Sequence, residues 1–227
     1  SAFAPLRTSN IRAMPANSFG VATPKILIVG GGYAGFYTAK KLEKSLRAGE
    51  AQVTLVDPLP YMTYQPFLPE VAAGSIEANH AIVSHRKHLR GTNIITGKVT
   101  NVNHAKKVAT IEVEGKAPYE FAYDQIVVTA GAVSRTFPIP GVADVCIGLK
   151  NIEEAVEVRN RLVANFDKAA NLPAGAERDR LLTFVVVGGG FAGIETFAEL
   201  RSLATSLIKF YPSISFNDVH FHLIEAM

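Results

Sequence analysis

The sequence predicts an α/β fold made of two similar strand–turn–helix units, with an antiparallel β-meander inserted in the first. The main observation is an internal repeat, because the segment ILIVGGGYAG at 26–35 returns as FVVVGGGFAG at 184–193, 158 positions later. A second observation is the region 93–128, where short β-branched and aromatic runs alternate with polar turns, as in neighbouring strands. Hydrophobic residues make up 48% of the 227 residues and charged residues 19%, which predicts packed domains and not a disordered chain.

The N-terminal segment 1–23 has a different character. It is rich in Ser, Ala, Asn and Pro, its only charges are Arg7 and Arg12, and it shows no helical or strand period. We expect a flexible tail, either a transit peptide or a disordered extension. The domains predicted after it are 24–141, for the first unit with the meander, and 142–227, for the second.

Each copy of the repeat contains a G-x-G-x-x-G motif between an apolar strand and a helical pattern, as in Rossmann-like dinucleotide-binding units. The first glycine permits a tight turn, the second lets the backbone approach a pyrophosphate, and the third lets the helix lie close to the strand. These glycines are Gly30, Gly32 and Gly35 in the first copy, and Gly188, Gly190 and Gly193 in the second. The residues that open the two helices, and whose N–H groups would face the phosphates, are Tyr33, Ala34, Phe191 and Ala192.

An acidic residue follows the second strand of each unit. Asp57 comes after the strand 51–56, 22 positions beyond the motif, where a carboxylate can bind the ribose hydroxyls of an adenosine. The alternative is a loop aspartate before Pro58. Glu225 follows the strand 219–224, 32 positions beyond its motif, so a ribose role and a surface charge both stay open. A ribose-binding Glu225 would repel a 2′-phosphate and favour NAD over NADP.

Two segments between the repeats are less regular. Residues 61–74 are aromatic and broken by prolines, which suits either an ordered loop against a planar ligand or a simply packed loop. The pattern of residues 82–90 predicts a short basic helix. Its charged side chains either contact an anionic group or are simply exposed to solvent. No metal site is predicted from His80, His85 and His88, since only the last two share a helix face and no acid lies nearby.

The next region is β-rich. The segments 93–102, 106–113 and 117–123 are separated by polar turns and predict the antiparallel meander. The segment 125–131 is apolar on both faces, which is typical of a buried parallel strand. It ends in small residues where backbone can approach a cofactor, and these are Thr129, Ala130 and Gly131.

An amphipathic helix is predicted over 151–170, before the second repeat. Asn151 is a suitable N-cap, and Glu154 stands at the capping-box position. The segment 131–148 is a crossover between the two domains.

Composition excludes several function classes. A net charge of +3 is too small to indicate a nucleic-acid partner. The only cysteine, Cys146, excludes an internal disulfide and any CxxC chemistry. The apolar runs have strand length, so no transmembrane helix is expected.

Several segments carry a resemblance to a known family. They are YQPFLPEVAAG at 64–74, RKHLRG at 86–91, YDQIVVTAGAVSRTFPIPG at 123–141 and LLTFVVVGGGFAGIE at 181–195. With the two motifs, they resemble the type II NADH dehydrogenases, which are NADH:quinone oxidoreductases among the flavoprotein reductases with two dinucleotide domains. The resemblance implies FAD on the first unit, NADH on the second and a membrane-dissolved quinone as electron acceptor. It also implies that Gln65, Pro66 and Val99 belong to the FAD site.

The same resemblance implies a location in the cell and an oligomeric state. We expect a respiratory, peripheral protein at the cytoplasmic face of a membrane, reaching the membrane through a region not present in this chain. A homodimer and no nucleic-acid partner are expected. The family continues beyond the second motif, so the chain is expected to be an N-terminal portion.

Glu195 is the catalytic candidate. The repeat offset pairs it with Tyr37, so it is not part of the shared phosphate scaffold. It either faces the nicotinamide, where it orients the carboxamide or relays a proton, or only favours the helix N-terminus as a negative charge.

Departures from the family leave alternatives open. Glu70 replaces a glutamine of the quinone-side loop, and the second motif reads GGGFAGIE where the family often has GGGPTGVE. A soluble FAD-dependent reductase of a ferredoxin- or rubredoxin-like carrier is therefore an alternative. A non-catalytic nucleotide-binding fragment or interaction module is another. Disulfide reductases and sulfide:quinone reductases are excluded because both need further cysteines.

Overall fold

A computed structural model describes residues 22–133 and 139–225 of the chain, which form two compact units. The first unit comprises the described residues up to Pro60 together with His85–Ala130. The second comprises Tyr61–Ser84 together with the described residues from Gly131 onward. Packing therefore assigns residues 61–84 to the second unit. The predicted bounds 24–141 and 142–227 refer to cofactor binding and stay a prediction.

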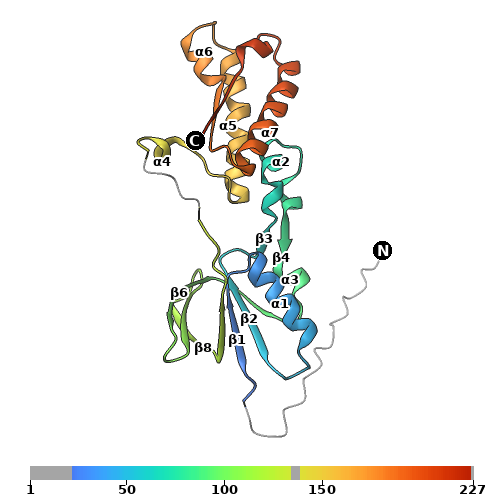
Figure 1. Cartoon of the computed structure of the whole chain (residues 1–227), viewed down its shortest axis with the longest axis vertical. Helices are drawn as coiled ribbons and strands as arrows, with labels where there is room; N and C mark the ends of the chain where they lie inside the picture. The colour runs from blue at the N-terminus through green and yellow to red at the C-terminus, as the bar shows by residue number, and fades with distance from the viewer. Residues whose placement is uncertain (1–21, 134–138, 226–227) are drawn as a thin grey trace, which may run out of the picture. The chain divides into compact units, whose positions relative to one another are not determined.

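The first unit is an α/β layer with a meander on it. Its elements are β1 (Lys25–Val29), α1 (Tyr33–Ser45), β2 (Gln52–Asp57), α3 (His85–His88), β5 (Asn93–Thr96), β6 (Lys98–Asn103), β7 (Val108–Glu112), β8 (Tyr119–Ala122) and β9 (Gln125–Val128). A parallel sheet has the order β5-β2-β1-β9, in which Val29 lies opposite both Val56 and Val128. Figure 1 shows α1 on one side of β1 and β2, and the meander strands on the other.

The core of this unit explains the apolar strands. Leu27 and Val56 are buried against the meander residues Ala109, Ile111 and Tyr123. The strand runs are apolar because both faces of β1 and β2 are covered, as in other parallel sheets. The predicted antiparallel meander is confirmed for β6, β7 and β8.

The prediction for the first strand of the meander was wrong in one respect. Residues 93–102 form two strands, because β5 joins the parallel sheet beside β2 and only β6 pairs with β7. The break is at Gly97, whose N–H donates to the Asp57 carbonyl over 2.9 Å. A Cβ at Gly97 would lie 2.6 Å from the Glu112 carbonyl oxygen, so only glycine lets the chain change sheets here.

The second unit holds the other elements. They are β3 (Tyr61–Thr63), η1 (Gln65–Phe67), α2 (Leu68–Ala72), η2 (Ala78–Ala81), β4 (Ile82–Ser84), α4 (Val142–Val145), α5 (Ile152–Ala170), α6 (Ala176–Leu181), β10 (Thr183–Val187), α7 (Phe191–Leu207), η3 (Ile208–Phe210), η4 (Phe216–Asp218) and β11 (His220–Ile224). In this unit β10 and β11 pair in parallel, while α2, α5 and α7 pack together around Phe166, Leu162 and Leu200.

The secondary structure of two irregular segments differs from the prediction. Residues 61–74 contain β3, η1 and α2 instead of one loop, and α2 is buried through Leu68 and Val71. Within 82–90, the first three residues form β4, which pairs antiparallel with β3, and only His85–His88 is helical. The β-branched pair Ile82–Val83 favours a strand over a helix start.

The predicted helix 151–170 and its N-cap are confirmed. The Asn151 side chain accepts a hydrogen bond from the Glu154 N–H over 2.8 Å. The Glu154 carboxylate accepts from the Lys150 N–H, one residue before the position that a capping box requires.

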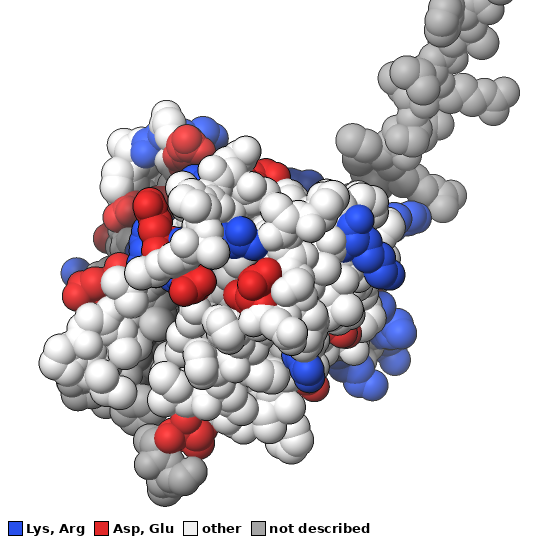
Figure 2. All heavy atoms as spheres, turned by 90° about the horizontal axis from the view of Figure 1, so that it is seen from above, with Lys and Arg blue, Asp and Glu red and all other residues white. Residues whose placement is uncertain are grey.

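One face of the protein carries charges of both signs (Figure 2). On the face drawn in Figure 2, acidic and basic side chains are interspersed, in keeping with the small net charge of +3. Among the described residues, no helix is both long and apolar enough to cross a bilayer.

Candidate functional site

The first glycine loop joins β1 to α1 in a conformation that only glycine adopts easily. Gly30 has φ +97°, and its N–H donates to the Val56 carbonyl over 2.8 Å. A Cβ there would lie 2.8 Å from the Thr129 carbonyl carbon. Thr129 in turn directs its hydroxyl to the carbonyl oxygens of Val29 and Gly30, at 2.9 and 2.8 Å. Thr129, at the end of β9, thus stabilises the turn that follows β1.

Gly32 and Gly35 have opposite surroundings. Gly32 is the N-cap of α1, and a Cβ built on it would meet no atom within 4 Å. Gly35 is buried, and a Cβ there would lie 3.0 Å from the carbonyl carbon of Gly30 and 2.7 Å from the Thr129 hydroxyl. Gly35 therefore lets α1 sit against the loop, while Gly32 borders open space where a phosphate can approach the backbone.

The start of α1 is suited to an anion. No side chain among the described residues caps this helix, and its first turn has no acidic residue. Tyr33 and Ala34, the first two helical residues, are exposed. The N–H groups of a first helical turn have no partners within the helix, so they and the helix dipole favour a negative ligand.

The Asp57 side chain forms a hydrogen bond with the backbone of this loop. Its carboxylate accepts a hydrogen bond from the Gly31 N–H over 2.5 Å and another from the Leu59 N–H over 2.7 Å. The Leu59 bond is the local role expected of an aspartate that starts a loop. The Gly31 bond ties the end of β2 to the glycine loop. The ribose role of Asp57 stays a prediction.

The second unit repeats this geometry. Gly188 has φ +105°, and its N–H donates to the Ile224 carbonyl over 2.8 Å. Gly190 is the N-cap of α7 with no atom within 4 Å of a Cβ, whereas a Cβ on Gly193 would lie 3.0 Å from the Gly188 carbonyl carbon. Gly190 and Gly193 thus have surroundings like those of Gly32 and Gly35. Gly188 shares the positive φ of Gly30 but not its close neighbours, since a Cβ on Gly188 would meet no atom within 4 Å.

Glu225 occupies the place that Asp57 has in the first unit. Its carboxylate accepts a hydrogen bond from the Gly189 N–H, the counterpart of the Gly31 bond. The strand registers agree as well, since Ile224 pairs with Val187 as Val56 pairs with Val29. The long separation between motif and acid is absorbed by α7, η3 and η4, and not by a change in the site.

The structure places the other residues predicted for the FAD site, but it does not test their role in binding. Gln65 and Pro66 belong to η1 of the second unit, where the Gln65 amide donates to the Lys150 carbonyl over 3.3 Å. Val99 packs against the core beneath the meander. Ala130 and Gly131 are exposed after β9. Their parts in an FAD site stay predictions.

Glu195 lies in the second turn of α7 with an exposed side chain. Phe191 and Ala192, which open this helix, are exposed too. The exposure of Glu195 leaves its carboxylate accessible to a bound nucleotide. The catalytic role stays a prediction.

Sequence reasoning missed His85. It was grouped with a basic surface helix, yet its ring is fully buried and contacts the carbonyl of Gly31. The available signal was the glycine between the first two motif glycines. A Cβ on Gly31 would lie 2.7 Å from the His85 Nε2, so this glycine, the middle one of three in a row, indicates a side chain packed under the loop.

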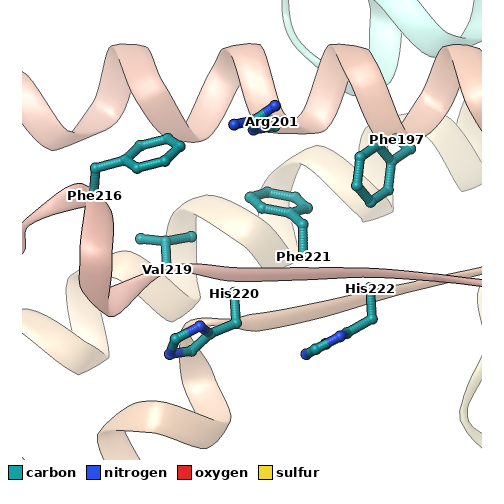
Figure 3. Close-up of a pocket in the computed structure, with 7 residues that line it drawn as sticks. All are labelled: Phe197, Arg201, Phe216, Val219, His220, Phe221 and His222. Atoms are coloured by element: carbon teal, nitrogen blue, oxygen red, sulfur yellow. The ribbon is translucent and has the colours of Figure 1, made fainter.

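A separate groove lies along the edge of β11 (Figure 3). Phe197, Phe221 and Arg201 lie on the helix side of the strand, whereas His220 and His222 point to its opposite side. None of the predicted nucleotide-binding residues lines this groove. Within 22–133 and 139–225, no group of three His, Cys, Asp or Glu side chains is placed to hold a metal ion.

The geometry of the two loops fits two dinucleotides. Each loop offers a glycine N-cap bordering open space, an uncapped helix start and a carboxylate at the end of the neighbouring strand. The sequence profile of the pyridine nucleotide-disulphide oxidoreductases matches residues 24–227. The chain belongs to the pyridine nucleotide-disulphide oxidoreductase family.

Two of its relatives are named as NAD(P)H-ubiquinone and NADH:quinone oxidoreductases. The chain is 33% identical over 219 residues to the external alternative NAD(P)H-ubiquinone oxidoreductase B2, mitochondrial, of Arabidopsis thaliana, which covers 91% of this chain and 37% of that protein. It is 34% identical to the type II NADH:quinone oxidoreductase of Staphylococcus haemolyticus, over 89% of this chain and 49% of that protein. The resemblance to type II NADH:quinone oxidoreductases is therefore confirmed.

Solved structures show the same relationship. The NDH2 of Plasmodium falciparum in complex with NADH matches with a TM-score of 0.80 and 28% identity, over 89% of this chain and 42% of that one. The predicted α/β, Rossmann-like fold class is confirmed. The chain spans between about a third and a half of the length of these relatives.

Proposed function

We propose that this chain forms the nucleotide-binding part of an FAD-dependent NADH:quinone oxidoreductase, with FAD on the first loop and NADH on the second. The observation that supports this most is the duplicated constellation of glycine N-cap, helix start and strand-end carboxylate. A single dinucleotide would need one such constellation. The order of the two nucleotides is the one that the family resemblance implies, and the similar NDH2 structure of Plasmodium falciparum is a complex with NADH.

The residues of the chain act by binding and positioning. In the first unit, the N–H groups at the start of α1 hold the pyrophosphate of FAD, and Asp57 keeps the loop in shape while facing the ribose. In the second unit, the start of α7 and Glu225 do the same for NADH. FAD, when bound, supplies the chemistry of hydride acceptance and electron delivery, so the protein contributes position and electrostatics.

Glu225 should determine the choice of nicotinamide nucleotide. Replacing it with Gln removes the negative charge that opposes a 2′-phosphate, so we expect the ratio of kcat/KM for NADH to that for NADPH to fall at least tenfold, about 1.4 kcal/mol. Steady-state kinetics of the FAD-loaded protein with both nucleotides measures this ratio. Asp57→Asn, the matched change in the first unit, should leave the ratio unchanged. An unchanged ratio in Glu225→Gln would make Glu225 a structural carboxylate only.

Glu195 should assist the nicotinamide. Its accessible carboxylate on α7 can accept a hydrogen bond from the carboxamide or hold a proton near it. Glu195→Gln keeps the shape but removes the charge and the proton, so flavin reduction by NADH should slow at least tenfold, about 1.4 kcal/mol of barrier. Stopped-flow absorption follows the reduction. If Glu195 only favours the helix N-terminus, the rate stays within twofold of wild type and stability falls by at most about 1 kcal/mol.

The electron acceptor is tested separately. A quinone dissolved in the bilayer requires action at a membrane surface, and we propose a peripheral location on its cytoplasmic face. Reoxidation of the NADH-reduced protein by a soluble quinone analogue, compared with reoxidation by ferredoxin or rubredoxin, distinguishes the acceptors. Rapid reoxidation by the quinone alone is expected. Reoxidation by the iron–sulfur carrier alone would favour a soluble carrier reductase.

A further inference from the structure

His85 lies directly beneath the first glycine loop, at the start of α3. Its side chain is 0% exposed, and its ring neighbours Phe36 of α1, with ring centroids 6.2 Å apart. The Nε2 atom lies 2.8 Å from the carbonyl oxygen of Gly31. Because a carbonyl oxygen only accepts hydrogen bonds, Nε2 carries the hydrogen and donates it.

This bond completes the anchoring of Gly31. Its N–H donates to Asp57 over 2.5 Å, and its carbonyl accepts from His85, so both of its polar groups are held. The peptide between Gly31 and Gly32 is planar and trans, so its carbonyl and the Gly32 N–H point in opposite directions. Holding the carbonyl on the buried ring therefore aims the Gly32 N–H away from His85. Gly32 itself borders open space.

A histidine is not needed here for packing. The other ring nitrogen, Nδ1, is buried and has no hydrogen-bond partner among the described residues. A buried polar atom without a partner lowers stability, so an aromatic hydrocarbon would fill the same space at less cost. The side-chain hydrogen bond that the ring makes to the loop is the feature that distinguishes histidine from phenylalanine at this position.

We infer that His85 is a positioning residue for the dinucleotide of the first unit. Its Nε2–H holds the Gly31 carbonyl, and the Gly32 N–H is thereby presented to the pyrophosphate before the nucleotide arrives. This inference rests on the proposed binding of FAD to the first loop. It also explains the middle glycine of the three at 30–32, since a Cβ on Gly31 would displace the ring.

Two variants separate positioning from packing. His85→Phe keeps a flat ring but has no donor, whereas the side-chain amide of His85→Gln reaches the position of Nε2 with an N–H. In FAD titrations of the cofactor-free protein, we expect His85→Phe to raise the Kd at least tenfold and His85→Gln to stay within threefold of wild type. The Tm of the cofactor-free His85→Phe protein should not fall by more than about 3 °C, because Phe fills the space and removes the unpartnered Nδ1. NADH binding to the second unit should be unchanged in both variants.

Two affinity results would overturn the inference. One is an FAD Kd for His85→Phe within twofold of wild type. The other is an equal loss of affinity in the Phe and Gln variants, which would show that a donor N–H at the position of Nε2 does not account for the effect.

A second measurement does not depend on FAD. In the cofactor-free protein, the ¹⁵N–¹H resonance of Gly32 reports the hydrogen bond to the preceding carbonyl. It should shift in His85→Phe and remain near its wild-type position in His85→Gln. An unshifted resonance in His85→Phe would contradict the His85 bond itself. Failure of the wild-type protein to bind FAD would instead contradict the proposed function, with the Gly32 resonance still deciding whether His85 orients the loop.

Discussion

Gly32→Val is expected to abolish flavin binding while the protein stays folded. The backbone at Gly32 has φ −67° and ψ −164°, which valine adopts readily, and a Cβ there meets no atom within 4 Å. The branched side chain would occupy the space in front of the N–H groups at the start of α1, where the pyrophosphate is proposed to lie. We expect FAD affinity to fall at least a hundredfold, about 2.8 kcal/mol. Valine is a poorer N-cap than glycine, which lowers stability by about 1 kcal/mol at most.

Gly190→Val is the matched control. It places the same side chain at the N-cap of α7, in equally open surroundings. It should leave FAD affinity within twofold of wild type and weaken NADH binding instead. Fluorescence titrations with each nucleotide measure both effects. If Gly190→Val loses the flavin and Gly32→Val keeps it, the two nucleotides are assigned to the wrong units.

Gly35→Ala should destabilise the first unit strongly, although it adds one methyl group. That methyl would run into the carbonyl group of Gly30 and the Thr129 hydroxyl, and the backbone of a buried turn cannot move aside. Overpacking of this kind lowers the free energy of unfolding by about 3 kcal/mol, more than the gain of up to about 1 kcal/mol from replacing a helical glycine with alanine. Urea denaturation followed by circular dichroism measures the change.

Gly32→Ser is the control for this prediction. It also adds a side chain within the same loop, but into open space and as a favourable N-cap. Its free energy of unfolding should equal that of wild type or exceed it by a few tenths of a kcal/mol. Equal stability of Gly35→Ala and wild type would show that α1 lies farther from the loop than the structure has it.

The glycine loops and their acids could be predicted from the sequence because each depends on local chemistry. The turn at Gly30 and the close approach of α1 to the loop at Gly35 follow from the G-x-G-x-x-G spacing, which few other structures need. Even Glu225, at an unusual separation from its motif, lies where a strand-end carboxylate should, since the two β-strands set its position and the connecting helix only sets the chain length.

The features that were missed depend on contacts distant in sequence. His85 meets Gly31 across 54 positions, and nothing in its basic neighbours Arg86 and Lys87 distinguishes a buried histidine from a solvated one. Likewise, the alternation of residues 93–102 continues through Gly97, so the change from the parallel sheet to the meander is visible only once Asp57 and Glu112 surround that glycine. Local pattern identified the strands but not their partners.

The most direct measurement is an anaerobic titration of the FAD-loaded protein with NADH, following the visible absorption of the bound flavin. If the first loop holds FAD and the second delivers NADH to it, about one equivalent of NADH bleaches the flavin, because a hydride carries the two electrons that full reduction needs. Gly190→Val should need a large excess of NADH for the same bleaching. A flavin that binds but stays oxidised in excess NADH would contradict the proposed pairing of the two units in one reaction.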